Sequence, residues 1–277
     1  MNEDMTQPFS VCMSVYKNDK PTDFLVAVRS IIDQTIKPSE IIMVVDGPIP
    51  NELEVAISTI KAEYDGLKLV RFEKNQGHAA ARQAGVDNAT NELVAVMDSD
   101  DIALPNRFEK QLSFLQANPD IDIVGGQIDE FIGEVVNVVG RREVPCVDAD
   151  IKTYLKSRCP MNLVTILARK SSIQKVGGYI DWFCEEDYYL WIRMALAGCK
   201  FANLPDTLVN VRVGKAMYQR RGGWKYFKSE AKLQHYMWKH GVIGMGHYLY
   251  NVAIRFVVQV AMPNSVRGWV FRTFARK

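Results

Sequence analysis

Residues Val94 to Asp101 read VAVMDSDD, an apolar run that ends in three carboxylates. In an extended segment alternate side chains share a face, so Asp98 and Asp100 point the same way beyond the end of a buried strand. Two carboxylates held that close repel each other unless a cation lies between them. Oxygen ligands favour hard ions such as Mg2+, Mn2+ or Ca2+, and Mg2+ commonly takes only one or two carboxylates with waters and substrate phosphates. The stretch therefore predicts a cation site at a strand end.

Two other uses of these acids have to be weighed. Asp is a good helix N-cap, and Pro105 before an amphipathic stretch is typical of a helix start, so Asp101 is a candidate cap. An EF-hand loop needs Asp or Asn and then Gly at positions where this chain has Ile102 and Ala103, so that calcium motif does not fit.

The stretch belongs to a regular alternation of strands and helices. Strands are expected at Phe9–Val15, Ile41–Val45, Leu67–Phe72 and Leu93–Met97, with helices at Phe24–Gln34, Glu52–Tyr64 and Ala79–Asn88 between them. This order predicts βαβ units and a mostly parallel sheet, whose ligand site lies outside the carboxyl ends of the strands. Polar loops follow these strands at Tyr16–Asp19, Asp46–Gly47, Asn75–Gly77 and Asp98–Asp101. We expect the four loops to converge on one crevice.

Beyond Asn106 the alternation is looser. Helices are expected at Arg107–Ala117 and Glu185–Leu196, and strands at Ile121–Phe131, Thr165–Ala168 and Leu208–Val213. No stretch has the composition of a flexible linker, so the second half is expected to extend the same sheet.

Composition narrows the class of protein. The chain has 277 residues, of which 48% are hydrophobic, so it can bury a substantial core. Its five cysteines are odd in number and lack CxxC spacing, which argues against a disulfide framework and a zinc site and favours a reducing cytoplasm. The N-terminus is polar and acidic, unlike a signal peptide.

Charge is divided unevenly along the chain. Residues 207–277 contain 13 Lys and Arg against one acid, a net charge of +12, whereas residues 1–206 carry −10. A basic tail can indicate a nucleic-acid partner. Here the basic residues are interleaved with long apolar stretches. This pattern favours an anionic membrane surface as the partner of the tail and argues against a nucleic acid.

Several motifs together resemble family 2 glycosyltransferases, in the order in which they occur in that family. They are SVYKND, VVDG, NQGHAAARQAG, DSDD, GGY at Gly177–Tyr179 and EEDYYLW at Glu185–Trp191. The resemblance covers Phe9 to about Trp224. It implies an α/β fold of the GT-A type, in which a Rossmann-like, mixed and mostly parallel sheet is flanked by helices, with a helical C-terminal tail. The usual dinucleotide and P-loop glycine motifs are missing.

The resemblance implies a role for each matching residue. Those expected to bind the nucleotide sugar are Tyr16, Asp46, Arg82, Asp98 and Ser99. Asp46 would accept a hydrogen bond from the base or ribose, whose N–H and hydroxyl groups are donors. Asp100 would be the ligand of Mn2+ or Mg2+ on the diphosphate. Taken singly, Asp46 also fits a turn before Gly47, and Arg82 a solvated surface charge.

Asp187 aligns with the general base of the family, which inverts the anomeric configuration by single displacement. An acceptor hydroxyl must lose its proton as it attacks, and a carboxylate within hydrogen-bond reach accepts it. Acids in the first turn of a helix also interact favourably with its dipole, so the cluster from Glu185 to Asp187 has a purely structural explanation as well.

The resemblance also places a mobile loop over the diphosphate at Val211–Trp224, where glycines permit hinge conformations. Its candidate diphosphate contacts are Arg212, Tyr218, Arg220 and Arg221. A solvated basic loop is the alternative. The QxxRW signature of processive synthases is absent around Gln219, which favours transfer of a single sugar.

We therefore expect three parts: residues 1–105 bind the nucleotide sugar, 106–223 bind the acceptor and carry the base, and 224–277 form a basic, amphipathic helical region. The expected activity is a metal-dependent, inverting transfer of one hexosyl or N-acetylhexosaminyl group. The donor would be a nucleoside diphosphate sugar, most simply a UDP-sugar, and the acceptor a growing surface glycan or lipid-linked saccharide. A sugar-phosphate nucleotidyltransferase and a catalytically silent sugar-nucleotide-binding protein are the alternatives.

The tail favours contact with a membrane surface. In Gly246–Met262 the polar residues Asn251, Arg255 and Gln259 recur every four positions and form a narrow stripe on an otherwise apolar helix. The segment is short for a membrane span. Val266–Lys277 mixes aromatic and basic residues as an interfacial helix does. We therefore expect a peripheral location at the inner face of the cell membrane. A helix packed on the body, or a contact in a homodimer, explains the first segment nearly as well.

Overall fold

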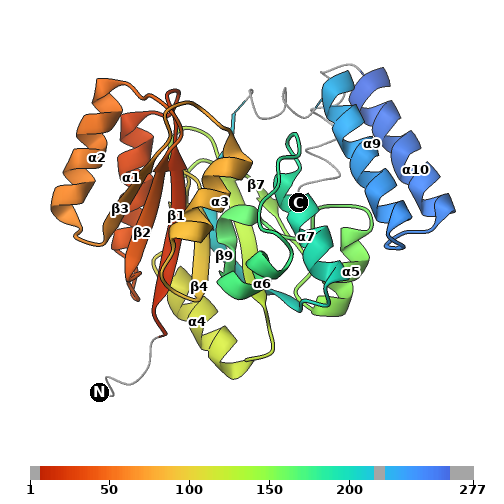
Figure 1. Ribbon diagram of the computed structural model, residues 1–277, viewed down its shortest axis with the longest axis horizontal. Coiled ribbons are helices and arrows are strands. Elements are labelled where there is room, and N and C mark those ends of the chain that lie inside the picture. Colours follow the sequence, from red (N-terminus) through yellow and green to blue (C-terminus); the bar gives the residue numbers. More distant parts are fainter. Residues whose placement is uncertain (1–6, 215–221, 263–277) are drawn as a thin grey trace.

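A single mixed sheet forms the centre of the protein (Figure 1). The computed structural model describes residues 7–214 and 222–262. Within them the sheet has nine strands in the order β3-β2-β1-β4-β8-β6-β9-β5, and β7 pairs with β6 beside this path. The strands are β1 (Phe9–Val15), β2 (Glu40–Val45), β3 (Leu67–Arg71), β4 (Leu93–Met97), β5 (Ile102–Ala103), β6 (Ile123–Phe131), β7 (Val138–Arg142), β8 (Leu167–Arg169) and β9 (Phe201–Arg212).

Strands β3, β2, β1 and β4 are parallel, as the alternation of strands and helices predicts. Strand β8 then runs antiparallel to β4 and β6, and β6 and β9 are parallel again. The carboxyl ends of the first four strands consequently lie along one edge of the sheet. The expected α/β class and the extension of the sheet by the second half of the chain are both confirmed.

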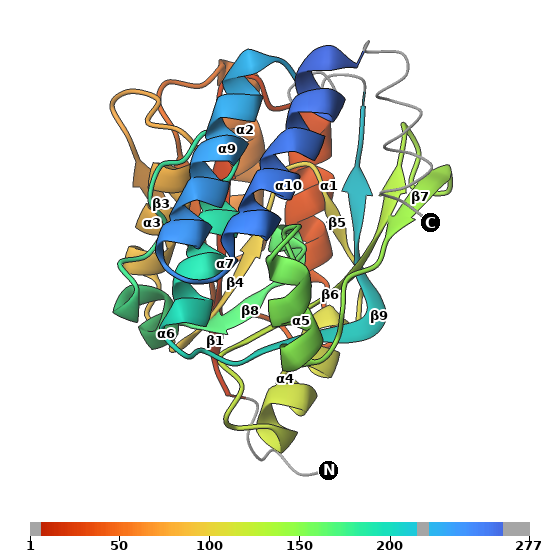
Figure 2. The ribbon, with the colours of Figure 1, turned by 90° about the vertical axis from the view of Figure 1, so that its right-hand side faces the viewer.

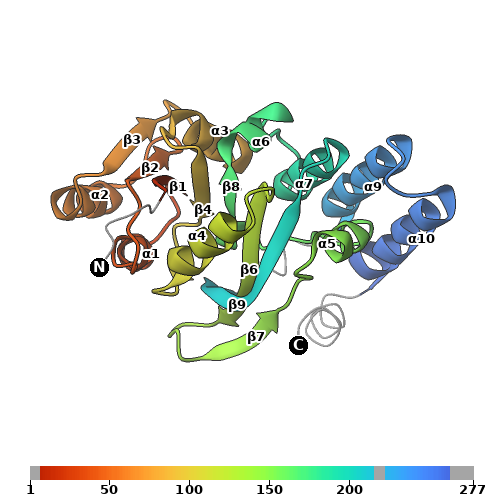
Figure 3. The same ribbon diagram turned by 90° about the horizontal axis from the view of Figure 1, so that it is seen from below.

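Two layers of helices cover the sheet because its central strands are apolar on both faces (Figure 3). Alternate residues such as Met13 and Met43 pack with α1 (Pro21–Ile32), α2 (Asn51–Glu63) and α4 (Arg107–Ala117). The residues between them, such as Cys12 and Ile42, pack with α3 (His78–Asn88), α5 (Asp148–Leu155), α6 (Lys170–Lys175) and α7 (Glu186–Leu196). Period-two alternation thus sets which helices each strand contacts.

The sequence predictions for the first half agree with the structure to within a few residues. The predicted strand at Thr165–Ala168 was wrong in its bounds, because Leu163–Thr165 form a 3-10 turn and β8 begins only at Leu167. The predicted strand at Leu208–Val213 is only the second part of the longer β9. Four elements were missed: β5, β7, α5 and α6. Each is short, and the first two valines of β7 are exposed, so periodicity gives no signal there.

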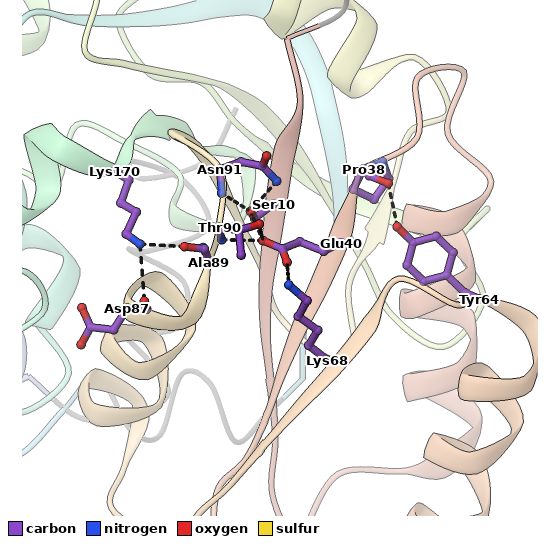
Figure 4. A network of polar contacts seen from close by, with 10 residues as sticks. All are labelled: Ser10, Pro38, Glu40, Tyr64, Lys68, Asp87, Ala89, Thr90, Asn91 and Lys170. Carbon is purple, nitrogen blue, oxygen red and sulfur yellow. Dashed lines mark hydrogen bonds and ion pairs between the residues drawn. The ribbon is translucent and has the colours of Figure 1, made fainter.

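A network of polar contacts lies at the amino end of β1 and β2, at the opposite edge of the sheet (Figure 4). The Oε1 atom of Glu40 accepts hydrogen bonds from Ser10 Oγ at 2.6 Å and from Thr90 N at 2.6 Å. Its Oε2 atom is 2.5 Å from Lys68 Nζ. Burial acts to raise the pKa of Glu40, but the hydrogen bonds from Lys68, Ser10 and Thr90 lower it to about 2. This carboxylate joins β1, β2, β3 and the end of α3.

The chain ends, within the described residues, in an antiparallel pair of helices at one side of the body (Figure 2). They are α9 (Trp224–Lys239) and α10 (Met245–Phe256), and a π-helical turn, Val257–Ala261, continues α10. Gly223 N donates to Gln259 O, so the start of α9 lies beside the end of this turn. In residues 7–214 and 222–262, no helix is long and apolar enough to cross a bilayer.

Candidate active site

The loop after β1 is tied to the acidic loop after β4 through Asp19. Its Oδ2 atom accepts a hydrogen bond from the backbone N of Tyr16 at 3.1 Å and one from Ser99 Oγ at 2.8 Å. Burial raises the pKa of Asp19, although Ser99 opposes that change. Tyr16 is half-buried and its ring lies edge-on to His78. The predicted nucleotide-binding residues Tyr16 and Ser99 are therefore brought together by a residue that sequence reasoning did not single out.

Asp46, after β2, organises the loop that precedes α3. Its carboxylate accepts hydrogen bonds from Asn75 Nδ2 at 2.8 Å and from the backbone N atoms of Gln76 at 2.6 Å and Gly77 at 3.0 Å. The residue is 6% exposed. The structural explanation of Asp46 and the one from the family resemblance are compatible. Asp46 fixes the shape of the loop, and the nucleotide is expected beside that loop. Its contact with a base or ribose stays a prediction.

Gly47 allows this close approach. Its φ is 87°, and an added Cβ would lie 2.5 Å from the backbone N of Asn75. A left-handed backbone already disfavours a side chain, and here there is no space for one. The VVDG motif thus has a local structural reason for its glycine.

Arg82, on α3, is buried and joins the two acidic clusters. Its Nη2 atom is 3.2 Å from Asp98 Oδ1, and its Nη1 atom forms a short ion pair with Glu186. Burial alone would lower the pKa of Arg82, but the carboxylates of Asp98 and Glu186 hold it above its ordinary value. The reading of Arg82 as a solvated surface charge was wrong, because the N-terminus of α7 packs over this part of α3. Contact of Arg82 with the donor stays a prediction.

Asp100 is exposed at the tip of the acidic loop. Burial of part of its carboxyl, together with the nearby carboxylates of Asp98 and Asp19, raises the pKa of Asp100 to about 6. Excess negative charge at this position is what a bound cation would offset. The chemistry of the donor set therefore fits a divalent ion.

Such a site would be open rather than enclosed. No group of three His, Cys, Asp or Glu side chains in the described ranges is arranged to hold a metal ion. Mg2+ is commonly bound through one or two carboxylates plus substrate phosphates, so Asp100 with a diphosphate agrees with that pattern.

Asp101 does not cap a helix, contrary to the expectation from the sequence. Helix α4 begins at Arg107 with Asn106 at its N-cap position. Asp101 is 3% exposed, and its Oδ1 atom accepts a hydrogen bond from the backbone N of Arg212 at 2.8 Å. Burial and then the neighbouring Asp98 and Asp100 raise the pKa of Asp101. Its role is to hold the end of β9 against the acidic loop.

Arg212 lies beside this loop, as the sequence predicts, but it is already engaged. Its Nε atom donates to Asp100 O at 3.2 Å, its Nη1 atom to Gly133 O at 2.8 Å, and its Nη2 atom is 3.3 Å from Asp23 Oδ1. Contact with a diphosphate stays a prediction. The other expected loop contacts, Tyr218, Arg220 and Arg221, lie outside the described residues.

Asp187 lies in the first turn of α7, half-buried. Its Oδ1 atom accepts a hydrogen bond from the backbone N of Tyr188 at 2.7 Å, and its Oδ2 atom is 3.8 Å from the thiol of Cys159. The neighbouring Glu186 is occupied by Arg82, and burial and then Asp187 raise the pKa of Glu186. Of these two acids, Asp187 is the one whose carboxylate forms no ion pair with a described residue.

Three residues of this site were missed from the sequence: Asp19, Glu186 and Cys159. The first two stand inside the quoted motifs SVYKND and EEDYYLW, so the signal was present but was assigned to their neighbours. Cys159 has no sequence signal, because it reaches Asp187 from 28 positions away.

Comparison with known proteins shows the family. The model of the family described as "Glycosyl transferase family 2" matches residues 10–179. The chain belongs to glycosyl transferase family 2. It is 34% identical over 99% of its length to an Escherichia coli "UDP-Gal:alpha-D-GlcNAc-diphosphoundecaprenol beta-1,3-galactosyltransferase", 98% of which is covered. It is also 37% identical over 81% of its length to the "Amylovoran biosynthesis glycosyltransferase AmsE" of Erwinia amylovora, 84% of which is covered.

The fold is shared with a solved glycosyltransferase structure. S. aureus TarS superposes with a TM-score of 0.63 at 15% identity, covering 96% of this chain and 48% of the TarS chain. This chain thus spans about half the length of that structure. The predicted GT-A fold is confirmed. The family 2 enzyme is a glycosyltransferase, and the nucleotidyltransferase and silent-protein alternatives are set aside.

Proposed function

We propose that this family 2 glycosyltransferase moves one hexosyl or N-acetylhexosaminyl group from a UDP-sugar to a hydroxyl of a lipid-linked saccharide, with inversion at the anomeric carbon. The observation that carries the proposal is Arg82, which holds the donor-side Asp98 and the Glu186–Asp187 pair of α7 at one place. A donor site and a base are thereby adjacent, and single displacement needs both.

The chemistry of the chain's own residues follows from this placement. The acceptor oxygen attacks the anomeric carbon as the bond from that carbon to the diphosphate oxygen breaks. The proton of the attacking hydroxyl passes to the Asp187 carboxylate, which general-base catalysis requires to be within hydrogen-bond reach. The electron pair of the broken bond leaves with UDP.

Asp100 is the residue proposed to hold Mn2+ or Mg2+. When bound, a divalent ion would supply Lewis-acid stabilisation of the charge on the leaving diphosphate. The elevated pKa of Asp100 supports this assignment, because the carboxylates of Asp98 and Asp19 place further negative charge beside it, which a bound cation would offset.

The donor and acceptor are proposed from similarity and chemistry. The E. coli relative is named for UDP-galactose and for an acceptor on a diphosphate-linked polyprenol. Similarity over nearly the full length of both chains supports the same classes of substrate here. A polyprenol acceptor lies in a membrane, so we place the enzyme in the cytoplasm, peripheral to the inner face of the cell membrane.

A donor screen tests the proposal. The purified protein is incubated with Mn2+ and each of UDP-galactose, UDP-glucose, UDP-N-acetylglucosamine and a GDP-sugar, and release of free nucleoside diphosphate is measured with and without a synthetic lipid-diphosphate saccharide. Release from one UDP-sugar that rises with the acceptor supports the proposal. Release of nucleoside diphosphate from the GDP-sugar alone would refute the assignment of a UDP-sugar as donor. If the acceptor changes the release from none of the donors, the proposed class of acceptor is refuted.

A further inference from the structure

Helix α10 presents its polar residues to the protein and its apolar residues to the outside. The polar stripe Asn251, Arg255 and Gln259 faces inward: Asn251 is 2% and Gln259 4% exposed, and the Arg255 side chain is 11% exposed. A surface helix of a globular protein normally has the opposite orientation. The stripe predicted from the sequence therefore exists, but it is the attached side of the helix.

Hydrogen bonds fix this orientation. Asn251 Nδ2 donates to Lys156 O at 2.9 Å and to Gln234 Oε1 at 2.8 Å. Arg255 Nη2 donates to Ser157 O at 2.7 Å, and its Nε atom is 3.0 Å from Glu230 Oε2. Buried polar groups left without partners are costly, so turning the helix over would break these contacts and expose apolar surface at once. The outward apolar face is therefore a stable feature.

The exposed side of α10 and its continuation is apolar throughout. We call the set Leu249, Tyr250, Ile254, Phe256 and Val257 the outer face of α10; their exposed fractions are 58%, 67%, 43%, 40% and 47%. Arg255 is the only Lys or Arg of residues 245–261, there is no Asp or Glu among them, and Arg255 points inward. Large contiguous apolar patches on soluble proteins mark interaction sites.

Aromatic rings continue this surface at one end. Trp224 is 57% exposed, and its ring lies 5.6 Å from that of Phe227 and 5.9 Å from that of Phe256. The start of α9 and the end of α10 lie at the upper end of the molecule in Figure 1, where β1 and β9 also have their carboxyl ends. The aromatic end of the patch is thus at the same end of the molecule as the candidate active site.

Charge decides between a membrane and a second copy of this chain as the occupant. Residues 222–262 carry the exposed lysines Lys225, Lys228, Lys232 and Lys239, and their only acid, Glu230, is paired with Arg255. In a contact between two copies, the lysines of α9 would bring like charges together, which is unfavourable across an interface. Anionic lipid headgroups attract the same lysines. Two of these lysines, Lys225 and Lys232, also lie over the rings of Phe183 and Trp182. An apolar face with exposed aromatic residues, next to a helix that bears exposed lysines, matches a bilayer interface.

We propose that the outer face of α10 lies on an anionic lipid bilayer, with the lysines of α9 contacting headgroups and the active-site end of the molecule close to the membrane plane. This inference deepens the proposed function, on which it rests for its purpose: a lipid-linked saccharide reaches Asp187 without leaving the bilayer. The binding itself is independent of catalysis and can be measured separately.

The test is flotation of the full chain with vesicles of phosphatidylcholine alone and of phosphatidylcholine with phosphatidylglycerol. We expect binding to anionic vesicles, weaker by about tenfold on neutral ones. The double variant Leu249→Glu with Ile254→Glu should lower binding to anionic vesicles by about tenfold or more, since it places two acids in the contact. The matched control is Val26→Glu with Val55→Glu, which changes two equally exposed aliphatic residues on α1 and α2 and should bind as the wild type does.

Two further measurements keep the outcome unambiguous. UDP binding in solution should be the same for all three proteins. If the wild type does not bind UDP, that result counts against the proposed function and not against the membrane face. Light scattering reports the oligomeric state. Unchanged vesicle binding of the Leu249/Ile254 variant would overturn the inference, as would a wild-type dimer that this variant converts to monomers without any vesicle binding.

Discussion

Asp187 differs from the other acids of the site in what surrounds it. Glu186 and Asp98 share Arg82, and Asp101 is held by the backbone of Arg212, whereas Asp187 contacts only one backbone N–H and a thiol among the described residues. A carboxylate in that position is able to accept a proton. For this reason we assign Asp187 the role of general base.

We expect Asp187→Asn to lower kcat by about 10²- to 10⁴-fold, because an amide does not accept the proton of the acceptor hydroxyl. The Kd for UDP should not change, since Asp187 is assigned to the acceptor hydroxyl and not to the nucleotide. Steady-state kinetics and calorimetry check the two statements. Asp181→Asn, in the exposed stretch before α7, is the control and should retain full activity. Transfer by the Asp187 variant at the wild-type rate would exclude the assignment.

Asp100 gives the site a defined pH dependence. Its pKa is raised to about 6, so the carboxyl gains a proton as the pH falls through that value, loses its negative charge and then ligates a cation poorly. We expect the affinity for Mn2+ with UDP to fall by up to about tenfold per pH unit below 6.

The matched control for this prediction is Asp100→Asn. This variant should bind Mn2+ with UDP weakly at every pH. Any change of its affinity with pH is then due to protonation of the diphosphate itself. Calorimetry between about pH 5 and about pH 7, one unit either side of the elevated pKa, makes the comparison. A wild-type slope equal to that of the variant would contradict the assignment of Asp100 as ligand.

At the scale of elements, Arg82 fastens α3 to the end of β4 and to the start of α7. Its side chain is 9% exposed and that of Glu186 is 14% exposed, so the pair is largely shielded from solvent. We expect Arg82→Met to cost about 3 kcal/mol of unfolding free energy, because the carboxylate of Glu186 is then buried without a partner. Urea denaturation measures it.

A double-mutant cycle assigns this cost to the ion pair. Adding Glu186→Gln to Arg82→Met should recover part of the loss, since no unpaired charge remains. The comparison is Arg71→Met, which breaks the exposed pair with Glu54 at 2.7 Å and should cost less than about 1 kcal/mol. Equal costs for the two arginines would show that α7 is held by other contacts.

Local pattern predicted the elements that are long and periodic. The buried strand before the acidic loop and the helix Arg107–Ala117 follow from the spacing of apolar residues. Contacts between distant residues do not follow from spacing. Asp101 looked like a helix cap because its neighbours in sequence favour one, yet its partner is Arg212, 111 positions away. The family resemblance brought the right loops together but could not assign Asp19 or Cys159, whose roles depend on tertiary contacts.

For the whole molecule, stabilising and functional charges lie at opposite edges of the sheet. The Glu40 network lies at the amino edge (Figure 4). The acidic loop, Arg82 and Asp187 lie at the carboxyl edge. Ligand sites of parallel sheets form at the carboxyl edge, so the amino edge is free to serve stability. The sheet itself separates the two sets of charges.

Glu40→Gln should therefore lower the free energy of unfolding without changing the binding of substrate. Because the folded pKa of about 2 lies below the ordinary value of 4.5, the ionised carboxylate stabilises the protein above about pH 4.5, and this contribution is lost as the pH falls toward 2. We expect a cost of about 2 to 3 kcal/mol at pH 7, measured by urea denaturation, with an unchanged Kd for UDP. Glu54→Gln, at the exposed pair, should cost less than about 1 kcal/mol. A changed UDP affinity in Glu40→Gln would refute the separation of the two edges.

The sequence also predicted the amphipathic tail but not its orientation. The spacing of polar residues predicted the stripe of Asn251, Arg255 and Gln259. From the hydrophobic pattern alone, such a stripe would be expected to face water. The hydrogen-bond partners that reverse it, among them Lys156 O and Gln234, come from other elements. Orientation is a tertiary property, since the same helix is stable either way until its partners are known.

The double ion pair of Arg82 has a thermodynamic consequence for how the two substrates bind. A guanidinium shared between Asp98 and Glu186 cannot strengthen one contact without altering the other, so an anionic donor arriving beside Asp98 changes the free energy of the acceptor side. Such linkage is reciprocal: the factor by which donor raises acceptor affinity equals the factor by which acceptor raises donor affinity. Coupled binding of donor and acceptor is what this one buried cation leads us to expect.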